Sequence, residues 1–499
     1  MLAFLATSLH VLGERCGKNE CNKYLLAFSM KRNWAILTYD RSKPRTDERM
    51  KDIACMEGIR FLGIQGVIFS HVIFIYLYSY IDNPQFIENM YDQVVWQYIL
   101  NSPLWLQAFF SLSGFLTAYT VLIGTECGQY NWLKCILAIV NRWIRLTPLA
   151  GFALWFTMAW FPLLGSGPQW GWLVQREAID CSGRWWYHLL YVHNHLPLGK
   201  LCMGHTWYLA VDMQLHILGM LLLLLMVRYR QTVIPILSTL LVATSLAAGV
   251  VVYVQQLTPI ITAQSPEALR TMFASSKVLP QLYLPVWMNL SGYVCGIGSA
   301  FLFYYCQTNG IKLNTNKGFN IVFHLALPVG TCVVLSGIVF LSDSPPPLWA
   351  AAVYAALDRT LVAICFNVFM LGCFFKCKSA IREAIEWRGF HTLGRLSYSA
   401  YLVHFIVLRL TLASSTQLGH ASILSMVSLL ITSSVYTYVV SVPLCLLLEL
   451  PMVQLWKAAV EPDRVNDRPA TPAPARPPTG APKTFDLVAQ LARRHHSLA

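Results

Sequence analysis

Charged side chains are scarce in this sequence. They make up 12% of the 499 residues, whereas 56% are hydrophobic and the mean hydropathy is +0.50. A water-soluble chain of this length needs far more charge on its surface. Short alternating strands, which are typical of a membrane barrel, are also lacking. Several stretches instead reach the roughly 20 apolar residues that cross a bilayer, so we predict an all-α, polytopic membrane protein.

Familiar catalytic and cofactor motifs are absent as well. The sequence has no P-loop, no GxGxxG and no Ser-His-Asp arrangement, and Ser111 in FFSLSGFLTAY lacks the context of a nucleophile elbow. The 14 cysteines form no CxxC pair and no zinc-like spacing. No internal repeat is visible. From these absences we expect no metal site and no tightly bound cofactor.

The net charge of +13 could suggest a nucleic-acid partner, but the positions of Lys and Arg indicate a membrane topology instead. Loop 81–103 holds Asp82, Glu88 and Asp92 and no basic residue. Since Lys and Arg concentrate in cytoplasmic loops, both termini are predicted to be cytoplasmic, in the endoplasmic reticulum or the plasma membrane. The bilayer is then the first partner, and no nucleic acid is expected. The basic loops are every alternate one: 13–58, 124–146, 228–232, 306–318 and 376–393.

About ten transmembrane helices are predicted from the apolar runs. Residues 1–50 are assigned to a basic cytoplasmic N-terminal segment, residues 51–456 to the transmembrane domain and residues 457–499 to a cytoplasmic tail. Within the tail, residues 461–482 are Pro-rich and are predicted to be disordered. The predicted spans are 59–80, 104–123, 147–164, 207–227, 233–254, 284–305, 319–341, 349–375, 394–412 and 421–449.

The loop 165–206 lies on the non-cytoplasmic side of this topology. It contains Cys181 and Cys202. Because that compartment is oxidising, one interpretation is a disulfide between these two cysteines. The other is two unpaired thiols, and the spacing alone does not decide between them.

The first predicted span begins with Arg60 and carries His71 near its middle. Eleven residues at 100° each amount to three turns plus about 20°, so the two residues share one helix face. The rise of roughly 16 Å places Arg60 at the cytoplasmic boundary and His71 near the bilayer midplane. An ionisable residue at that depth usually faces a polar cavity. One interpretation is a general base above a cation that holds an anionic ligand; the other is a neutral histidine hydrogen-bonded between helices.

A second group of cations lies in NRWIRLTP, residues 141–148, where the third span is predicted to begin. Arg142 and Arg145 are three residues apart and are expected to point the same way. Paired guanidinium groups fit phosphate oxygens with two hydrogen bonds each. The alternative is a membrane anchor that follows the preference of basic residues for the cytoplasmic side.

The fourth span opens with HTWYLAVDMQLH, residues 205–216. Asp212 and His216 are four residues apart and can pair inside the bilayer. They could orient hydroxyl groups of an acceptor or line a polar cavity, and a purely structural pair explains them equally well. Asp358 and Arg359, in the eighth span, are predicted to form an internal ion pair.

Six ordered motifs of this sequence resemble the animal nose resistant to fluoxetine proteins, a branch of the acyltransferase-3 membrane acyltransferases. The resemblance covers about residues 50–450. The motifs are EGIR…SH with its arginine eleven residues before its histidine, FFSLSGFLTAY, NRWIRLTP, WWYHLLYVHN, CMGHTWYLAVDMQLH and LGRLSYSAYLVHF.

This resemblance implies a ten-helix core that takes acyl groups from a cytoplasmic acyl-CoA donor. It implies His71 as the catalytic base, and Arg60, Arg142 and Arg145 as donor-binding or structural residues. The CoA phosphates would lie at the basic cytoplasmic face, and the thioester would reach His71. The acceptor, an unknown molecule with a hydroxyl group, would enter from the other side or from the lipid.

Two features depart from the family pattern. Animal members usually begin with a signal peptide, a luminal domain with cysteines and one more span. Here residues 1–12 are a candidate remnant of such an upstream helix. His216 stands where relatives more often carry an aromatic residue, which argues against a catalytic role for it.

Three classes of function are compatible with these observations. The first is an O-acyltransferase that uses acyl-CoA. The second is a transporter or uptake factor for lipids and hydrophobic drugs, because intramembrane His, Asp and Arg also suit a transport path. The lack of an inverted repeat and of paired broken helices argues against it. The third, a receptor or scaffold, does not explain an Arg–His face that points into the bundle.

Overall fold

The computed structural model describes residues 1–16, 22–39, 52–90, 93–128, 130–261, 276–342 and 344–460. The predicted disorder of residues 461–482 falls outside these ranges. Within them the regular structure is helical, and β-structure is limited to an isolated bridge between Ile81 and Gly419. The prediction of an all-α fold is therefore confirmed.

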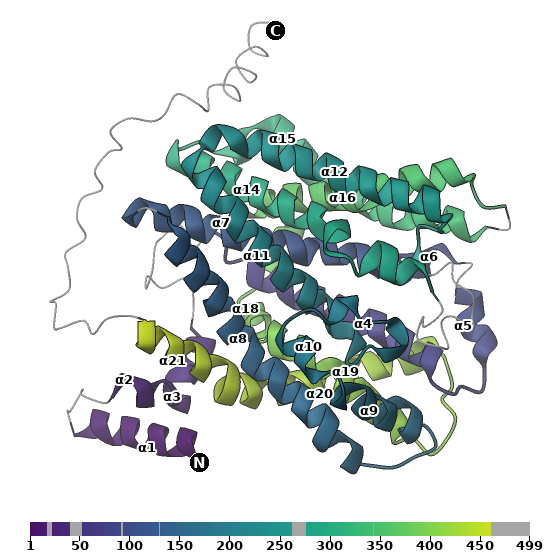
Figure 1. Cartoon of the computed structure of the whole chain (residues 1–499), viewed down its shortest axis with the longest axis horizontal. Coiled ribbons are helices and arrows are strands. Elements are labelled where there is room, and N and C mark those ends of the chain that lie inside the picture. Colours follow the sequence, from purple (N-terminus) through teal and green to yellow (C-terminus); the bar gives the residue numbers. More distant parts are fainter. Residues whose placement is uncertain are drawn as a thin grey trace, which may run out of the picture.

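Long apolar helices run side by side through the molecule (Figure 1). Helices α7, α12, α15 and α16 run from left to right in this view, and α8 and α11 cross them obliquely. The long helices are α4 (Met56–Tyr78), α7 (Leu106–Gly124), α8 (Trp132–Ala159), α11 (Trp207–Arg228), α12 (Val233–Gln255), α14 (Leu290–Thr308), α15 (Lys317–Leu335), α16 (Leu348–Phe374), α19 (Ser397–Ala413) and α20 (Ile423–Leu444).

Shorter helices and turns join the long ones at both ends. The shorter α-helices are α1 (Leu2–Arg15), α2 (Lys23–Leu26), α3 (Met30–Leu37), α5 (Pro84–Met90), α6 (Val94–Leu100), α9 (Arg176–Ser182), α10 (Trp185–Leu189), α17 (Ala380–Ile385), α18 (Gly389–Arg395) and α21 (Leu450–Val460). The turns that bear on the site are η2 (Ser102–Trp105), η8 (Gly204–Thr206) and η15 (Cys445–Glu449).

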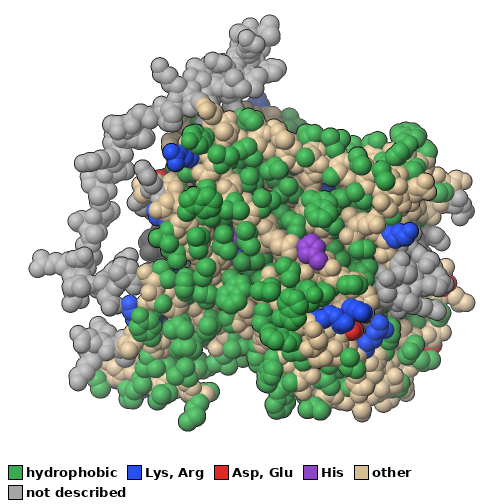
Figure 2. Space-filling model, viewed as in Figure 1, with side chains coloured by type: hydrophobic (Ala, Val, Ile, Leu, Met, Phe, Trp, Pro, Cys, Tyr) green, Lys and Arg blue, Asp and Glu red, His purple; other side chains and the backbone are tan. Residues whose placement is uncertain are grey.

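The number of membrane-crossing helices agrees with the prediction of about ten. In the part of the chain that the structure describes, nine helices are long and apolar enough to cross a bilayer. A tenth span results if α18 and α19, which are bent by 70° relative to each other, are counted together. Hydrophobic side chains cover most of the face shown in Figure 2, and a few charged ones interrupt them. Such a surface suits lipid, so the protein is an integral, multi-pass membrane protein.

The third predicted span has a different start in the structure. Helix α8 begins at Trp132 and ends at Ala159, whereas the apolar run predicted 147–164. The side chain of Asn131 caps the helix by accepting a hydrogen bond from the amide of Lys134, at 3.0 Å. The hydropathy pattern did not predict the first half of α8, because an apolar run ends at charged residues. A helix, however, continues wherever each charged side chain has a partner or reaches solvent.

The tenth predicted span has a different end. Residues 421–449 were expected to cross the membrane, and the observed helix continues from α20 through η15 and α21 to Val460. The apolar run stops at Glu449, yet this residue is 4% exposed and accepts a hydrogen bond from Ser399 of α19 at 2.8 Å. A bonded carboxylate does not end a helix.

Helices α7 and α14 pack with their backbones nearly in contact. A Cβ atom on Gly114 would lie 2.3 Å from the carbonyl oxygen of Tyr293, and one on Gly296 would lie 2.1 Å from that of Ser111. Only glycine fits at such a crossing. The hydroxyl of Ser111 also accepts from the side-chain amide of Asn367 on α16, at 2.8 Å. Ser111 therefore ties these helices together in the core.

The two ends of the bundle carry different structures. At the left of Figure 1, α1–α3 lie beside α21, and Arg395 of α18 donates to the carbonyl of Leu37 in α3 at 2.8 Å. At the right lie α5, α6 and α9. Helices α9 and α10 belong to the segment 165–206, in which Cys181 and Cys202 form a disulfide. Of the two interpretations of these cysteines, the structure supports the disulfide.

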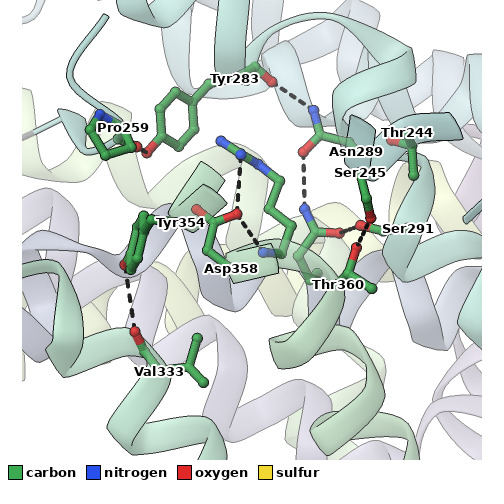
Figure 3. Close-up of polar contacts among 12 residues, drawn as sticks. Thr244, Ser245, Pro259, Tyr283, Asn289, Ser291, Val333, Tyr354, Asp358 and Thr360 are labelled. Atoms are coloured by element: carbon green, nitrogen blue, oxygen red, sulfur yellow. Dashed lines mark hydrogen bonds and ion pairs between the residues drawn. The ribbon is translucent and has the colours of Figure 1, made fainter. Parts of the chain in front are cut away.

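A buried polar network surrounds the ion pair predicted in the eighth span (Figure 3). Asp358 and Arg359 of α16 are 2% and 4% exposed, and Nη1 of Arg359 lies 3.4 Å from Oδ1 of Asp358. The guanidinium lies over the ring of Tyr283, 4.7 Å from its centroid. The hydroxyl of Tyr283 donates to the carbonyl of Pro259 at 3.2 Å. The predicted internal pair is confirmed, and it holds the segment before α14 against α16.

Candidate functional site

A cavity of about 660 Å³ runs along α4. Its wall includes Ile59 near the start of this helix, His71, and Tyr78 at its end. Tyr78 lies 19 residues after Ile59, a rise of about 28 Å, which is close to the hydrocarbon thickness of a bilayer. Ile385 of α17 lines the cavity from the basic segment that follows α16. Glu177 of α9 lines it from residues 165–206, which we call the disulfide segment. The cavity therefore touches elements from both ends of the bundle.

His71 is half-buried and lines this cavity. Its Nδ1 lies 2.9 Å from Nε2 of His404, a fully buried residue of α19. Nδ1 of His404 in turn lies 2.6 Å from the carbonyl oxygen of Tyr401, one turn earlier in the same helix. The backbone carbonyl and the two imidazoles thus form a chain that ends at the cavity.

This chain fixes the tautomers of both rings. A carbonyl oxygen can only accept, so Nδ1 of His404 donates to Tyr401. A neutral imidazole has one N–H group, so Nε2 of His404 is an acceptor, and Nδ1 of His71 donates to it. Nε2 of His71 is then the nitrogen without a proton. This arrangement leaves His71 with a hydrogen-bond acceptor for a group in the cavity.

A third histidine, His205 in η8, lines the same cavity. The centroid of its ring lies 6.3 Å from that of His71 and 5.3 Å from that of His404. The ring stacks on Phe405 at 4.9 Å, and the hydroxyl of Tyr401 donates to the backbone carbonyl of His205 at 2.5 Å. The residue is 8% exposed, and its two ring nitrogens have no hydrogen-bond partner among the described residues.

The disulfide segment holds His205 in place from its N-terminal side. Cys202 is covalently fixed, and Met203 adopts a left-handed conformation with φ of +42°, which turns the chain into η8. The amide of Met203 donates to Glu177 at 2.6 Å. The other carboxylate oxygen of Glu177 lies 2.8 Å from Nη1 of Arg409 on α19. Both charged side chains are buried and line the cavity near its disulfide end.

Two further histidines, His188 and His193, stack at 3.9 Å in the disulfide segment, outside the membrane-spanning helices. The hydroxyl of Thr206 lies 3.1 Å from Nε2 of His193 and 3.5 Å from Nδ1 of His188. Burial lowers the pKa of His188 to about 2, with a further contribution from His193, and burial lowers the pKa of His193 to about 4. Both rings are therefore neutral at physiological pH. Within the described residues, no three His, Cys, Asp or Glu side chains are placed to hold a metal ion.

Arg60 lies in the same helical stripe as Gly63 and His71, as the spacing predicts, but it is not part of the cavity wall. Its Nη1 lies 3.3 Å from a carboxylate oxygen of Glu57, one turn earlier in α4. The side chain is 25% exposed. Arg60 is therefore a partly open cation at one end of α4, and His71 faces the cavity three turns further on.

Arg142 points into the bundle and joins three helices. Its guanidinium forms an ion pair with Asp212 of α11, donates to the hydroxyl of Ser113 in α7 at 3.0 Å, and donates to Nδ1 of His216 at 3.2 Å. The sequence suggested that Asp212 and His216 pair directly, but in the structure both bond to Arg142. The reason is that a guanidinium has five N–H donors and α8 brings it between the two side chains. None of these four residues lines the cavity.

Arg145 has different surroundings. It is exposed, and its charge acts on Glu449 and Tyr398, on the side where η15 lies. Arg142 is paired with Asp212 whereas Arg145 is exposed, so the two guanidinium groups have different surroundings, and their binding to one donor stays a prediction. Arg145 is the most exposed of the three arginines implied as donor-binding residues.

Sequence reasoning missed His404, His205 and the pair of Arg409 and Glu177. His404 stands in LGRLSYSAYLVHF and His205 in CMGHTWYLAVDMQLH, two of the motifs that carry the family resemblance. The argument applied to His71, an ionisable residue at membrane depth, applies equally to His404 and Arg409. That argument says which residues are unusual. It does not say which of them meet across helices that are far apart in the sequence.

Comparison with known proteins agrees with the motifs. The model of a family described as the acyltransferase domain matches residues 53–449. Nose resistant to fluoxetine protein 6 of Caenorhabditis elegans is 26% identical over 425 residues, which are 80% of this chain and 49% of that protein. Regulator of hypoxia-inducible factor 1 from the same organism is 25% identical over 222 residues, 42% of each chain. The chain thus spans about half the length of the curated relatives it matches, and no solved structure matches it.

Proposed function

Because this chain belongs to the acyltransferase domain family, we propose that it is a membrane O-acyltransferase that moves an acyl group from acyl-CoA to a hydroxyl group. The family match supports a membrane acyltransferase in general. The acyl-CoA donor, the catalytic base and the side of the membrane are our proposal. The observation that carries it is the hydrogen-bonded pair of His71 and His404 in the wall of the cavity along α4.

His71 acts as the general base in this proposal. Its Nε2 accepts the proton of the acceptor hydroxyl while the oxygen attacks the carbonyl carbon of the thioester. The hydrogen bond from Nδ1 to His404 holds the ring in the tautomer that leaves Nε2 free, and the carbonyl of Tyr401 orients His404 in turn. This is the relation of an orienting group to a base that recurs in acyl-transfer enzymes.

The proton balance closes without another reactant. The C–O bond forms as the acceptor O–H bond breaks, and the C–S bond of the thioester then breaks. The proton held on Nε2 of His71 passes to the departing thiolate, so the products are the ester and free CoA. A single histidine can therefore serve as base in the first half of the reaction and as acid in the second.

The donor is proposed to enter from the end of the bundle that carries α17 and the start of α4, which the charge pattern predicts to be cytoplasmic. Its phosphates would meet exposed cations there, Arg145 first and the partly exposed Arg60 second. Arg142 would contribute by holding α8 to α11 through Asp212. The pantetheine arm and acyl chain would follow the apolar cavity to His71.

The acceptor is proposed to reach His71 from the end formed by the disulfide segment, or from the lipid. With both termini in the cytoplasm, that end would face the lumen of the endoplasmic reticulum or the cell exterior. A cavity touched by both ends also suits a transport path. The family match does not favour that alternative, and an ordered base–orienter pair is not a requirement of transport.

The proposal is tested with purified protein in detergent, by following the release of free thiol from acetyl-CoA and longer acyl-CoAs. Water alone or added alcohols serve as acceptors. We expect His71→Ala to lower the rate per CoA-binding molecule by about 10²–10⁴-fold, because that is what a general base contributes. Calorimetric affinity for CoA should change little, since the base acts on the acceptor.

The same preparation separates the donor site from the base. Arg145→Ala should weaken CoA binding, by about tenfold if one charge-assisted contact is lost. Arg145→Lys should recover part of that affinity, since it keeps the charge but loses the planar fork. A His71→Ala protein with the wild-type rate, or a wild-type protein that releases no thiol from any acyl-CoA, would refute the acyltransferase proposal.

A further inference from the structure

Acyl transfer needs two polar groups at the reacting carbon. One must take the proton of the attacking hydroxyl, and the other must donate a hydrogen bond to the carbonyl oxygen, which gains negative charge in the transition state. His71 supplies the first, because the chain through His404 leaves its Nε2 as an acceptor. The same chain shows that His71 cannot supply the second, since its one N–H group is already bonded to His404. The wall of the cavity must therefore provide a separate donor.

We propose that His205 is this second catalytic histidine and that its ring N–H binds the oxyanion. A neutral imidazole always carries one N–H, and in His205 neither ring nitrogen has a partner among the described residues although the residue is 8% exposed. A buried donor without a partner is rare in a native protein and calls for an unseen ligand or water. This inference rests on the acyl transfer proposed above and extends it to a residue that the sequence did not identify.

His205 and His71 line the same cavity. Their ring centroids lie 6.3 Å apart with the planes at 76°, so the two rings meet edge to face instead of stacking. A thioester in the cavity beside both rings can have its attacking oxygen within hydrogen-bond reach of one ring and its carbonyl oxygen within reach of the other. Phe405 touches both rings, at 5.2 Å from His71 and 4.9 Å from His205, and holds their relative positions.

The ring of His205 is also rigidly mounted, as an oxyanion donor must be. It stacks on Phe405 with an interplanar angle of 27°, and its backbone carbonyl accepts from Tyr401. On the other side, the disulfide at Cys202 fixes the chain three residues before it. The ring and the backbone on both sides of it are therefore held in place before the charge develops.

Another donor in the cavity wall is less well placed. Nε1 of Trp105 is buried and lacks a partner among the described residues. The ring of Trp105, however, packs against Gly66, where a Cβ atom would lie 3.1 Å from it. Gly66 precedes His71 by five residues, about 7.5 Å along α4. Trp105 therefore lies near the path of the donor arm, and His205 lies at the level of the base.

The proposed role gives His205 a defined part in the reaction. As the hydroxyl oxygen bonds to the thioester carbon and its proton moves to Nε2 of His71, the carbonyl π-electrons move to oxygen. The N–H of His205 holds that oxygen by a hydrogen bond and keeps its proton. When the C–S bond breaks, the carbonyl re-forms, the hydrogen bond weakens, and the thiolate takes the proton from His71.

The test compares His205→Phe, which keeps the ring shape without a donor, with His205→Gln, which keeps a side-chain N–H. Thiol release from acetyl-CoA with water as acceptor is measured per CoA-binding molecule, with CoA affinity from calorimetry. We expect His205→Phe to lower the maximal rate about 10²–10³-fold with CoA affinity unchanged within twofold, and His205→Gln to recover at least tenfold of that loss. His324→Phe is the matched control, because His324 is an exposed residue of α15 whose Nδ1 lies 2.8 Å from the carbonyl of Asn320.

The outcomes separate this inference from the proposal on which it rests. If His71→Ala is inactive and His205→Phe releases thiol within threefold of the wild-type rate, His205 is not the donor. If His205→Phe and His205→Gln lose rate equally while both bind CoA, the ring acts by its shape and the inference is overturned. Should either variant fold poorly, His205→Asn offers the same amide on a shorter arm, with the rate again expressed per CoA-binding molecule. If the wild type releases no thiol, the acyltransferase proposal and the role of His205 fall together.

Discussion

The histidine site and the Asp358–Arg359 pair are both buried polar groups inside membrane-spanning helices. Both also have polar atoms without a partner among the described residues: the ring nitrogens of His205, Oδ2 of Asp358 and Nη2 of Arg359. The difference lies in what they face. His71 and His205 line the cavity along α4, whereas Asp358 and Arg359 do not and are covered by Tyr283 and its neighbours (Figure 3).

This contrast teaches that an unpaired buried atom does not by itself mark a site. Asp358 and Arg359 neutralise each other at 3.4 Å, so the pair can be sealed into the core. His71 and His205 carry no net charge when neutral, so they can line an open cavity without a charged partner. Access and the direction of free donors and acceptors distinguish a reactive group from a structural one.

The largest expected effect tests the hydrogen bond between His71 and His404. His404→Ala should lower the rate of thiol release per CoA-binding molecule by about 10²–10⁴-fold, because His71 loses the group that fixes its tautomer. His404→Gln should recover much of the rate, since an amide oxygen can accept from Nδ1 of His71. A shifted pH profile in His404→Gln would support a positioning role. If total thiol release falls equally in both variants, and only in proportion to the amount of folded protein, His404 is a packing residue only.

The next effect tests the structural side of the comparison. Asp358→Ala leaves Arg359 buried without its partner, and we expect a loss of about 3–5 kcal/mol in unfolding free energy. The rate per CoA-binding molecule should stay close to that of the wild type. Thermal unfolding in detergent and thiol release measure the two quantities on the same sample.

A double replacement sharpens this test. In Asp358→Leu with Arg359→Met, both charges are removed together, so much of the lost stability should return. The opposite result is that Asp358→Ala folds normally and shows no turnover, as expected for His71→Ala. That result would refute the distinction between the cavity-lining histidines and the buried Asp358–Arg359 pair.

The smallest effect, about 2 kcal/mol for each residue between pH 6.5 and pH 5, concerns His188 and His193, which are buried in the disulfide segment. In the unfolded chain a histidine takes up a proton below about pH 6.5, whereas in the folded chain the pKa values are lowered to about 2 and about 4. The unfolded state therefore binds more protons below pH 6.5, and stability falls as the pH falls. Each residue should cost about 1.4 kcal/mol per pH unit between pH 6.5 and its folded pKa.

This prediction is measured as the slope of the unfolding temperature from pH 7.5 to pH 5. His193→Gln removes one of the two titrating groups, so it should flatten the slope even if its unfolding temperature at neutral pH is lower. The same slope in the wild type and in His193→Gln would show that this region does not control the acid sensitivity. His71 is not included in this test, because it lines the cavity.

The sequence alone determined the class of the protein. Apolar runs of about 20 residues predicted about ten membrane-spanning helices. In lipid, only an α-helix or a closed β-barrel satisfies all of its own backbone hydrogen bonds. Local signals also identified His71, the internal pair at Asp358 and Arg359, and the two cysteines that could form a disulfide. Local signals predicted the start of α8 and the end of the tenth span wrongly. A hydropathy window contains no information on the ion pair of Arg142 with Asp212 or on the hydrogen bond of Glu449 with Ser399.

Only the tertiary structure decided which of these residues lie together. His71 and His404 are 333 residues apart in the chain, and His205 lies between them on a third element, so no spacing rule connects them. The same packing turned Arg142 inward and left Arg145 outside. The physical reason is that helical periodicity fixes which face a side chain occupies on its own helix. The neighbour that this face meets depends on how helices far apart in sequence pack, as α7 and α14 do through Gly114 and Gly296.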